Sequence, residues 1–283
     1  MVSSTTETKA AANPAGYLLR QWRGRRGKTQ LDLSFDSGIS QKHISFVESG
    51  RSTPSRQTLL DLAQALDVPL RERNTLLLAA GYAPIYAQAA LDEPAMKSIN
   101  KALQRMLRQH EPFPAIVMDR YWNMLFTNEA APRLFNCFID MNARPGRRNL
   151  LHLMFDPARM RPFIANWHDA ARSLLARVYR EALGRVIDTE TRNLLDELSK
   201  YPGVAPEWRT PTPDDMTPVI PLAFRKGDVT LNYFSMITTV GTPQTIAAEE
   251  LRLECMFPAD EFTEDMHSRF VLMNSKAGSS AQH

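Results

Sequence analysis

The chain has 283 residues, of which 43% are hydrophobic and 23% charged, as is ordinary for a globular protein. This length exceeds that of a typical single domain and favours two domains. No apolar run is long enough to cross a bilayer, and the polar start MVSSTTETKAAANP lacks the apolar centre of a secretion signal. We therefore expect a cytoplasmic protein without a membrane partner. The two cysteines, Cys137 and Cys255, lie far apart without a motif, which argues against a disulfide framework.

The positive charge is concentrated at the beginning of the chain. Residues 1–84 hold 11 Lys/Arg and 7 Asp/Glu, a net charge of +4, whereas the remaining residues hold 23 and 24, a net charge of −1. Five cations fall within nine residues that contain no acid: Arg20, Arg23, Arg25, Arg26 and Lys28. Such a cluster suits a polyanionic partner, although a solvated helix face has the same composition.

In chain order, the pattern predicts five segments. Residues 1–13 are small and polar and are expected to form a disordered tail. Short helical patterns fill residues 14–82, and residues 83–111 form a linker with a helix over 95–109 that either connects the domains or contributes to a dimer seam. Residues 112–262 form the second domain, and residues 263–283 a C-terminal segment that is mobile at its end.

The second domain mixes strands and helices. Two short strands flank the polar turn Asp119–Tyr121, and helical patterns follow over 162–182 and 189–199. After a Pro-rich loop over 201–218, a hairpin turns at Lys226-Gly227-Asp228, and the run AAEELRLECMFPAD predicts a last strand. The predicted fold class is therefore α+β with two domains, an all-α head followed by an α/β domain with an antiparallel sheet.

Within the head, residues 29–50 carry the pattern of two short helices joined by a tight turn. Thr29 can cap a helix over 30–37, Gly38 permits the left-handed backbone of a sharp turn, and Ser40 can cap a second helix over 41–49. This is the geometry of a helix-turn-helix, whose second helix enters the DNA major groove. The side chains that would face the bases and can hydrogen-bond their edges are Gln41, Lys42 and Ser45.

The stretch TQLDLSFDSGISQKHISFVESGRSTPS resembles the XRE (Cro/repressor) helix-turn-helix family, and TLLDLAQALDVPLRERNTLLLAAGYAP resembles its last two helices. The resemblance implies a five-helix head and an Arg23–Glu48 ion pair that ties the first helix to the recognition helix. Departures from the family pattern are Ser34, where alanine is usual, and Phe46, where a polar or basic residue is common. The resemblance implies these DNA contacts: Gln30 and Arg51 to phosphates, Gln41 to a base, and Lys42, His43 and Ser45 to bases or nearby phosphates.

The second domain shows no catalytic motif. The histidines lack zinc-binding spacing, so no metal is expected, and no phosphate-binding glycine loop or nucleophile motif occurs. We therefore expect no enzyme. The domain is instead rich in large flexible and aromatic side chains, which either enclose an apolar cavity or fill the core.

Three stretches of the second domain, MDRYWNMLFTNEAAPRLF, NLLHLMFDPARMRPFIANWHDAARSLLARVYREA and VIPLAFRKGDVTLNYFSMITTVGTPQTIAAEELRLECMFPAD, are similar to the MmyB-like ligand-binding domain. This resemblance implies a PAS-like fold and a small apolar, fatty-acid-like ligand, with no other cofactor. The stretch 136–148 is long and basic for the family, and an Arg-rich insertion common in actinobacterial members is missing.

The candidate ligand-binding residues combine the apolar set with two groups that could hold a carboxylate, and they are Met118, Trp122, Met124, Phe126, Phe135, His152, Phe155, Phe163, Trp167, Arg172, Phe234 and Met236. His168 and Asn166 are further polar candidates. Two alternatives are a haem site with His152 or His168 as axial ligand and a flavin site at Cys137, which has no supporting context.

These patterns predict a homodimeric, one-component transcriptional regulator that binds double-stranded operator DNA and responds to a small apolar ligand. A first alternative is a ligand-independent regulator whose second domain dimerises or recruits a protein such as RNA polymerase. A second is an enzyme with an accessory DNA-binding head, and a third is a toxin–antitoxin repressor, which seldom needs so large a second domain.

Overall fold

The computed structural model describes residues 13–141, 148–183, 188–210 and 218–279. They form two compact units. The first, called the head, contains residues 13–89 together with Gln244–Glu249, and the second, called the sheet domain, contains the other described residues. Parts of the predicted tail, of the basic stretch 136–148, of the Pro-rich loop and of the C-terminal end lie outside the described residues. No helix among the described residues is both long and apolar enough to span a membrane.

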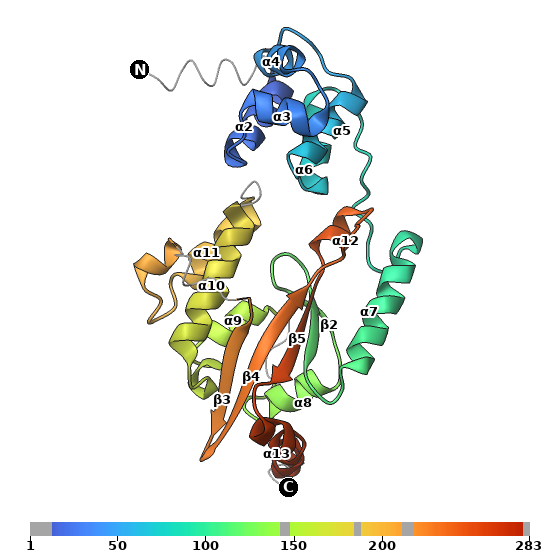
Figure 1. Ribbon diagram of the computed structural model, residues 1–283. Helices are drawn as coiled ribbons and strands as arrows, with labels where there is room; N and C mark the ends of the chain where they lie inside the picture. The colour runs from blue at the N-terminus through green and yellow to red at the C-terminus, as the bar shows by residue number, and fades with distance from the viewer. Residues whose placement is uncertain (1–12, 142–147, 184–187, 211–217, 280–283) are drawn as a thin grey trace. The chain divides into compact units, whose positions relative to one another are not determined.

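The head is a bundle of five helices (Figure 1), as the sequence predicts. Side-chain caps fix where they begin: Thr29 and Asp32 form a capping box, and Ser40 and Ser55 each accept from a backbone N–H three residues ahead. Gly38 has φ 70° and ends the first helix of the motif. The helices are α2 (Pro14–Arg25), α3 (Gln30–Ser37), α4 (Gln41–Ser49), α5 (Arg56–Ala65) and α6 (Leu70–Ala79).

One apolar cluster holds the head together. Each helix contributes buried side chains, and Trp22, Leu33 and Val47 are at most 2% exposed. The unit extends past residue 82 because the Asn74 side chain hydrogen-bonds the backbone of Ile85 and Tyr86. Pro69 gives α6 no side-chain cap.

The sheet domain is built on five antiparallel strands in the order β2-β1-β5-β4-β3. Their bounds are β1 (Ala115–Met118), β2 (Met124–Thr127), β3 (Ile220–Lys226), β4 (Val229–Thr238) and β5 (Arg252–Pro258). The last strand lies in the middle of the sheet and joins the hairpin β3–β4 to the hairpin β1–β2. The five strands confirm the predicted antiparallel sheet.

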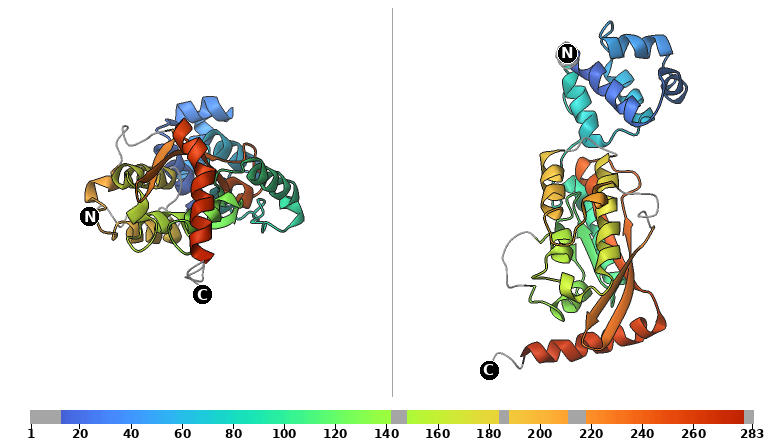
Figure 2. Two further views of the ribbon diagram at one scale, coloured as in Figure 1. Left: turned by 90° about the horizontal axis from the view of Figure 1, so that it is seen from below. Right: turned by 90° about the vertical axis from the view of Figure 1, so that its left-hand side faces the viewer.

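Helices pack against both faces of this sheet, and the larger core lies on one of them. In Figure 1, α10 lies near β3, and α7 lies near β1 and β2. The helices that follow the five-helix bundle in the chain are α7 (Lys97–Gln109), α8 (Ala130–Asn136), α9 (Leu150–Phe155), α10 (Trp167–Leu183), α11 (Thr189–Leu198), α12 (Ile246–Glu250) and α13 (Glu261–Ser279), with 3₁₀ turns at Pro94–Met96, Arg161–Phe163 and Pro206–Arg209. All of α12 except Glu250 belongs to the head unit. Figure 2 shows α13 extending from the end of the sheet.

Three boundaries differ from the sequence-based expectation. The run predicted as one last strand begins with the short helix α12, in which the Thr245 hydroxyl accepts from the N–H of Ala248. The helix predicted from residue 162 begins at Trp167, because Ile164 forms a β-bridge with Phe224. Helix α13 continues to Ser279, through residues that were expected to lack regular structure.

Candidate DNA interface and ligand-binding domain

One face of helix α4 packs in the core of the head, and the opposite face is exposed. Ile44 and Val47 are each 1% exposed in the head core, whereas Gln41 and Lys42 are exposed. The Ser40 hydroxyl accepts from the N–H of His43, which fixes the N-terminal turn of the helix. The exposed turn therefore has the side chains and the rigidity that base recognition requires.

Helix α2 approaches the C-terminal half of α4 closely. The Asn13 amide donates to the carbonyl of Val47 at 2.9 Å, and its oxygen accepts from the N–H of Gly16. A Cβ on Gly16 would lie 2.3 Å from the Val47 carbonyl oxygen. This crossing requires glycine and fixes the orientation of α4 in the head.

An ion pair braces α4 from the same side. Arg23 donates to both carboxylate oxygens of Glu48, at 2.7 and 2.9 Å, and this contact raises the pKa of Arg23. The Glu48 side chain is 5% exposed, and it also accepts from the Gln30 amide at 2.9 Å. The expected pair is confirmed, but the Gln30 amide, predicted to contact a phosphate, is engaged with Glu48.

Phe46, one of the departures from the family pattern, lies between two cations. The Lys42 ammonium is 5.7 Å and the Arg51 guanidinium 5.8 Å from the centre of its ring. Such cation–π contacts restrict long side chains without neutralising them. Phe46 thus orients the two cations that flank the recognition helix.

The basic cluster near residues 20–28 mostly serves the fold. Arg23 pairs with Glu48, Arg26 donates to the carbonyls of Leu66 and Asp67, and Lys28 binds Asp36 and the carbonyl of Ala65. Three of these five cations therefore bind other groups of the head and stabilise its fold. The cluster is for this reason weaker evidence for DNA binding than its composition indicates.

The residues predicted to line a ligand pocket are distributed over several places in the sheet domain. Five are at most 7% exposed and fill the core: Met118, Trp122, Phe135, Phe155 and Trp167. Met124 and Phe163 pack against that core. Phe126, Phe234 and Met236 lie on the opposite sheet face, since their register partners Val117, Phe257 and Cys255 alternate with the core-facing residues. His152 bonds Tyr201 and Glu197, and Arg172 is exposed on α10.

The cavity inside this core is small. Its volume is about 10 Å³, which is enough for about one water molecule. Of the predicted residues, Phe135 lines it, beside Leu174, Met256 and the carboxyl of Glu254. Trp167 and His168 instead line a surface groove of about 460 Å³, where the Arg161 guanidinium lies 3.7 Å from the centre of a Trp167 ring.

Sequence reasoning missed the buried charges of this domain. Glu254 is 3% exposed with one carboxyl oxygen unpaired, and burial raises its pKa, opposed by the nearby Ser235 hydroxyl and Arg177. Arg120 donates to Glu250 at 2.9 Å and to Asp188 at 2.7 Å. Polar residues that alternate along a strand usually indicate a face exposed to solvent. On β5, however, Glu254 lies on the core side of the sheet, because its register partner on β1 is the buried Ile116.

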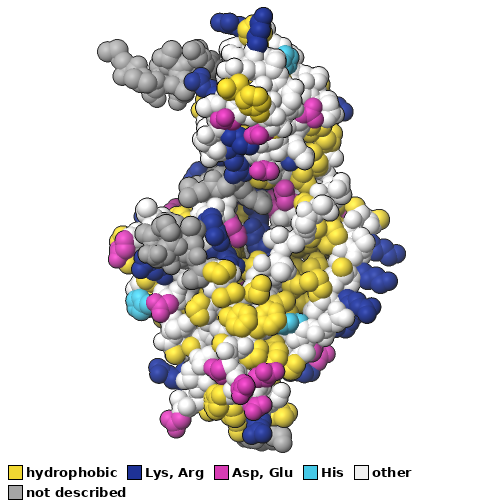
Figure 3. All heavy atoms as spheres, viewed as in Figure 1, with side chains coloured by type: hydrophobic (Ala, Val, Ile, Leu, Met, Phe, Trp, Pro, Cys, Tyr) yellow, Lys and Arg dark blue, Asp and Glu magenta, His cyan; other side chains and the backbone are white. Residues whose placement is uncertain are grey.

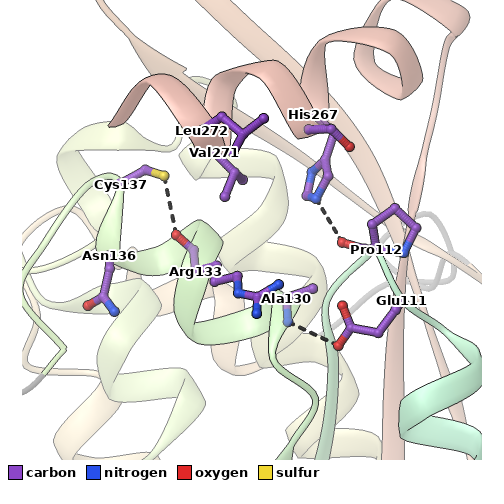
Figure 4. Close-up of a pocket in the computed structure, with 10 residues that line it drawn as sticks. Glu111, Pro112, Ala130, Arg133, Asn136, Cys137, His267, Val271 and Leu272 are labelled. Atoms are coloured by element: carbon purple, nitrogen blue, oxygen red, sulfur yellow. Dashed lines mark hydrogen bonds between the residues drawn. The ribbon is translucent and has the colours of Figure 1, made fainter. Parts of the chain in front are cut away.

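A larger pocket opens where α13 passes over α8 (Figure 4). Its volume is about 610 Å³, and most of its exposed surface is apolar. None of the residues predicted to bind an apolar ligand lines it, whereas Cys137, the candidate for a flavin site, does. Its lining residues are Glu111, Pro112, Ala130, Arg133, Asn136, Cys137, His267, Ser268, Val271 and Leu272. A sequence pattern could not reveal this pocket because its wall comes from three separate segments.

These features define a protein with a DNA-binding helix-turn-helix head and a second domain of α+β type. Residues 99–269 match the MmyB-like transcription regulator ligand binding domain, and residues 19–73 match a helix-turn-helix family. The first match covers more than half of the chain, which therefore belongs to the MmyB-like transcription regulators. The chain is a transcriptional regulator with a DNA-binding domain and a ligand-binding domain.

Two individual proteins show local or distant likeness. An uncharacterized HTH-type transcriptional regulator, y4dJ, of Sinorhizobium fredii (strain NBRC 101917 / NGR234) is 46% identical over 46 residues, which are 16% of this chain and 60% of that protein. The chain thus spans less than two thirds of that relative. The structure of an RNA-binding light-oxygen-voltage receptor aligns over 99% of this chain and 70% of its own, with 13% identity and a TM-score of 0.27, too low to indicate a shared fold.

Proposed function

We propose that this regulator reads operator DNA with the N-terminal turn of α4 and that a small apolar ligand in the sheet domain modulates its affinity. The observation that carries the proposal is the exposed polar turn of α4 on a helix fixed by Ser40, Asn13 and Glu48. In this account Gln41, Lys42, His43 and Ser45 contact base edges or adjacent phosphates, and Arg51 contacts a phosphate.

The predicted phosphate contact of Gln30 can involve both its side chain and its backbone. One N–H of its amide is donated to Glu48, which leaves the other amide N–H and the backbone N–H at the start of α3. Helix N-termini bind phosphates through backbone N–H groups. We propose that α3 contributes its N-terminal N–H groups to a phosphate and that the Gln30 side chain holds Glu48.

We further propose that the protein acts as a homodimer. One head reads only a few base pairs, and two heads on half-sites about one helical turn apart multiply the specificity. A ligand can change DNA affinity only by binding the two states of the dimer unequally. A PAS-like sheet domain is supported by the five-stranded antiparallel sheet with helices packed on it.

One observation favours the alternative of a ligand-independent second domain. Among the described residues, the core cavity that Phe135 lines has a volume of only about 10 Å³, too small for an effector. In that case the sheet domain would dimerise or bind a protein such as RNA polymerase. Figure 3 shows apolar side chains gathered over β3, β4 and β5, and Met236 on β4 is 43% exposed, which suits a protein contact.

The test of base reading is Gln41→Ala in the full chain, on an operator obtained by selection from random duplex DNA. We expect a loss of about 1–3 kcal/mol at one operator position and almost no change in the salt dependence of binding. Gln57→Ala, an exposed glutamine of α5 that bonds Asp61, is the matched control and should leave every position unchanged. An equal loss on all DNA sequences would show that Gln41 does not read a base.

A further inference from the structure

Helix α7, the first α-helix of the sheet domain, is strongly basic. Its 13 residues include four cations and no acid. The part of the chain that follows it, residues 110–283, holds 19 Lys/Arg and 22 Asp/Glu, a net charge of −3. Positive charge is thus concentrated on this helix, beside a domain that is otherwise acidic. The four cations, called the basic stripe, are Lys97, Lys101, Arg105 and Arg108.

The basic stripe occupies one face of α7. At about 3.6 residues per turn, its four positions fall within an arc of about 80° and extend over about 17 Å of the helix axis. All four residues are exposed, whereas Leu103 and Leu107 on the opposite face are 7% and 2% exposed, and the helix packs on β1. Figure 3 shows a row of Lys and Arg side chains at the right-hand edge, where Figure 1 places α7. The sheet therefore holds a row of cations toward solvent.

The basic stripe does not stabilise the fold. Among the described residues, none of its four side chains forms an ion pair, whereas three cations of the basic cluster in the head bind other groups of the head. Like charges four residues apart repel each other, as in Lys97 and Lys101, and the first turn of α7 has no acid to interact with the helix dipole. This cost in helix stability argues for an anionic partner outside the chain.

The phosphate backbone of duplex DNA fits the basic stripe in charge and in length. Duplex DNA carries one negative charge per about 1.7 Å of its axis, so a row of cations about 17 Å long can meet several phosphates. The head unit ends at Ala89, and the eight residues from there to Lys97 span at most about 29 Å when extended. Because of this short connection, a duplex bound by the head is at a high effective concentration for α7.

We propose that the basic stripe of α7 is a second DNA contact, which binds phosphates of the duplex that the head reads. The proposal goes beyond the helix-turn-helix and rests on the proposed function in that the head brings the duplex to α7. Phosphate contacts carry no sequence information, so the basic stripe adds affinity on every duplex and leaves base preference to α4. Its loss should therefore have the opposite signature to Gln41→Ala, which changes base preference but hardly the salt dependence.

The test is a variant of the full chain in which glutamine replaces all four residues of the basic stripe. Its affinity for the selected operator and for an unrelated duplex is measured by fluorescence anisotropy over a series of salt concentrations. Each lost phosphate contact lowers the slope of log K against log salt by about 0.9. We expect the slope to fall by about 2–4 per chain and both duplexes to bind at least about tenfold more weakly at physiological salt. The ratio of the two affinities should stay the same.

Three further variants separate the basic stripe from total charge and from misfolding. Exchange of Lys for Arg and of Arg for Lys at the four positions keeps the charge and should retain the slope. Lys101→Gln alone is one exposed substitution and should lower the slope by up to about 0.9. The matched control replaces four other exposed cations of the sheet domain by glutamine and should change the slope by less than about 1. These control residues are Arg192, Lys200, Arg209 and Arg225.

An unchanged slope in the glutamine variants of the basic stripe, or an equal change in the control, would overturn the proposal. If the slope is unchanged but the four-residue variant loses binding to vesicles of phosphatidylcholine and phosphatidylserine, the partner is an anionic membrane and not DNA. The outcome for α4 is separate. If the parent protein selects no operator, base reading by α4 fails, whereas the slopes on an unrelated duplex still decide whether α7 binds phosphates.

Discussion

At the scale of single residues, Glu48 has the most consequential side chain in the head. It accepts hydrogen bonds from Arg23 and Gln30 and so joins α2, α3 and α4 through one nearly buried carboxylate. Removing the partner of a buried charged group costs considerable stability. Removing one partner of the more exposed Lys28–Asp36 pair in the same head costs little.

We therefore expect Glu48→Ala to destabilise the head by about 1.5–3 kcal/mol, because it leaves Arg23 without its partner. Asp36→Ala is the control and should cost less than about 1 kcal/mol. Native-state hydrogen exchange of the α4 amides measures the local stability of this helix in both variants. Similar exchange rates in the two variants would contradict a bracing role for Glu48.

Glu254 gives a prediction for pH dependence. Burial raises its folded-state pKa above the ordinary value, so between the two values the folded protein binds the proton more strongly than the unfolded chain. This group therefore lowers stability as pH rises from about 4.5 through the folded-state pKa.

Glu254→Gln should remove this pH dependence. The free energy of unfolding of the variant minus that of the parent protein should become more positive from pH 5 to pH 8, as measured by urea denaturation at each pH. Arg177 loses a neighbouring negative charge only at pH values where Glu254 is ionised in the parent protein, so the trend with pH is the informative quantity. A difference that is constant over this range would show that Glu254 titrates normally.

At the scale of elements, the sequence predicted the helices and strands that capping residues and turn residues mark locally. The caps Thr29 and Ser40 and the turn glycine Gly38 define α3 and α4 from residues adjacent in sequence. The hairpin at Lys226–Asp228 was likewise predictable, since β3 and β4 pair around it. Helix α12 was missed because its short Ala-Glu run joins a strand directly.

The crossing of α2 and α4 gives a matched pair of glycine variants. Gly16→Ala should destabilise the head by at least about 1–3 kcal/mol, because its Cβ would overlap the Val47 carbonyl oxygen. Gly24→Ala, in the same helix with no atom within 4 Å of its Cβ, should instead stabilise it by about 0.5–1 kcal/mol. Thermal denaturation compares the two, and effects of the same sign would refute the close crossing.

At the scale of the whole molecule, the functional residues of the head could be predicted from the sequence more fully than those of the sheet domain. The residues proposed to read DNA follow from one continuous motif, in which helical spacing separates Gln41 and Lys42 from the buried Ile44 and Val47. The pocket between α8 and α13 could not be predicted, because Glu111, Arg133 and Leu272 meet only through tertiary packing. The aromatic residues predicted to line a cavity lie on both sheet faces, a distinction that requires the strand register.

The central claim is that this chain is a regulator that reads a specific DNA sequence through α4. The most direct measurement is selection by the full chain from random duplex DNA, followed by affinity measurement at a stated salt concentration. The account predicts a two-fold symmetric site with half-sites about one helical turn apart, bound at least about 10³-fold more tightly than unrelated DNA. Recovery of no common sequence, with equal affinity for all duplexes, would contradict it.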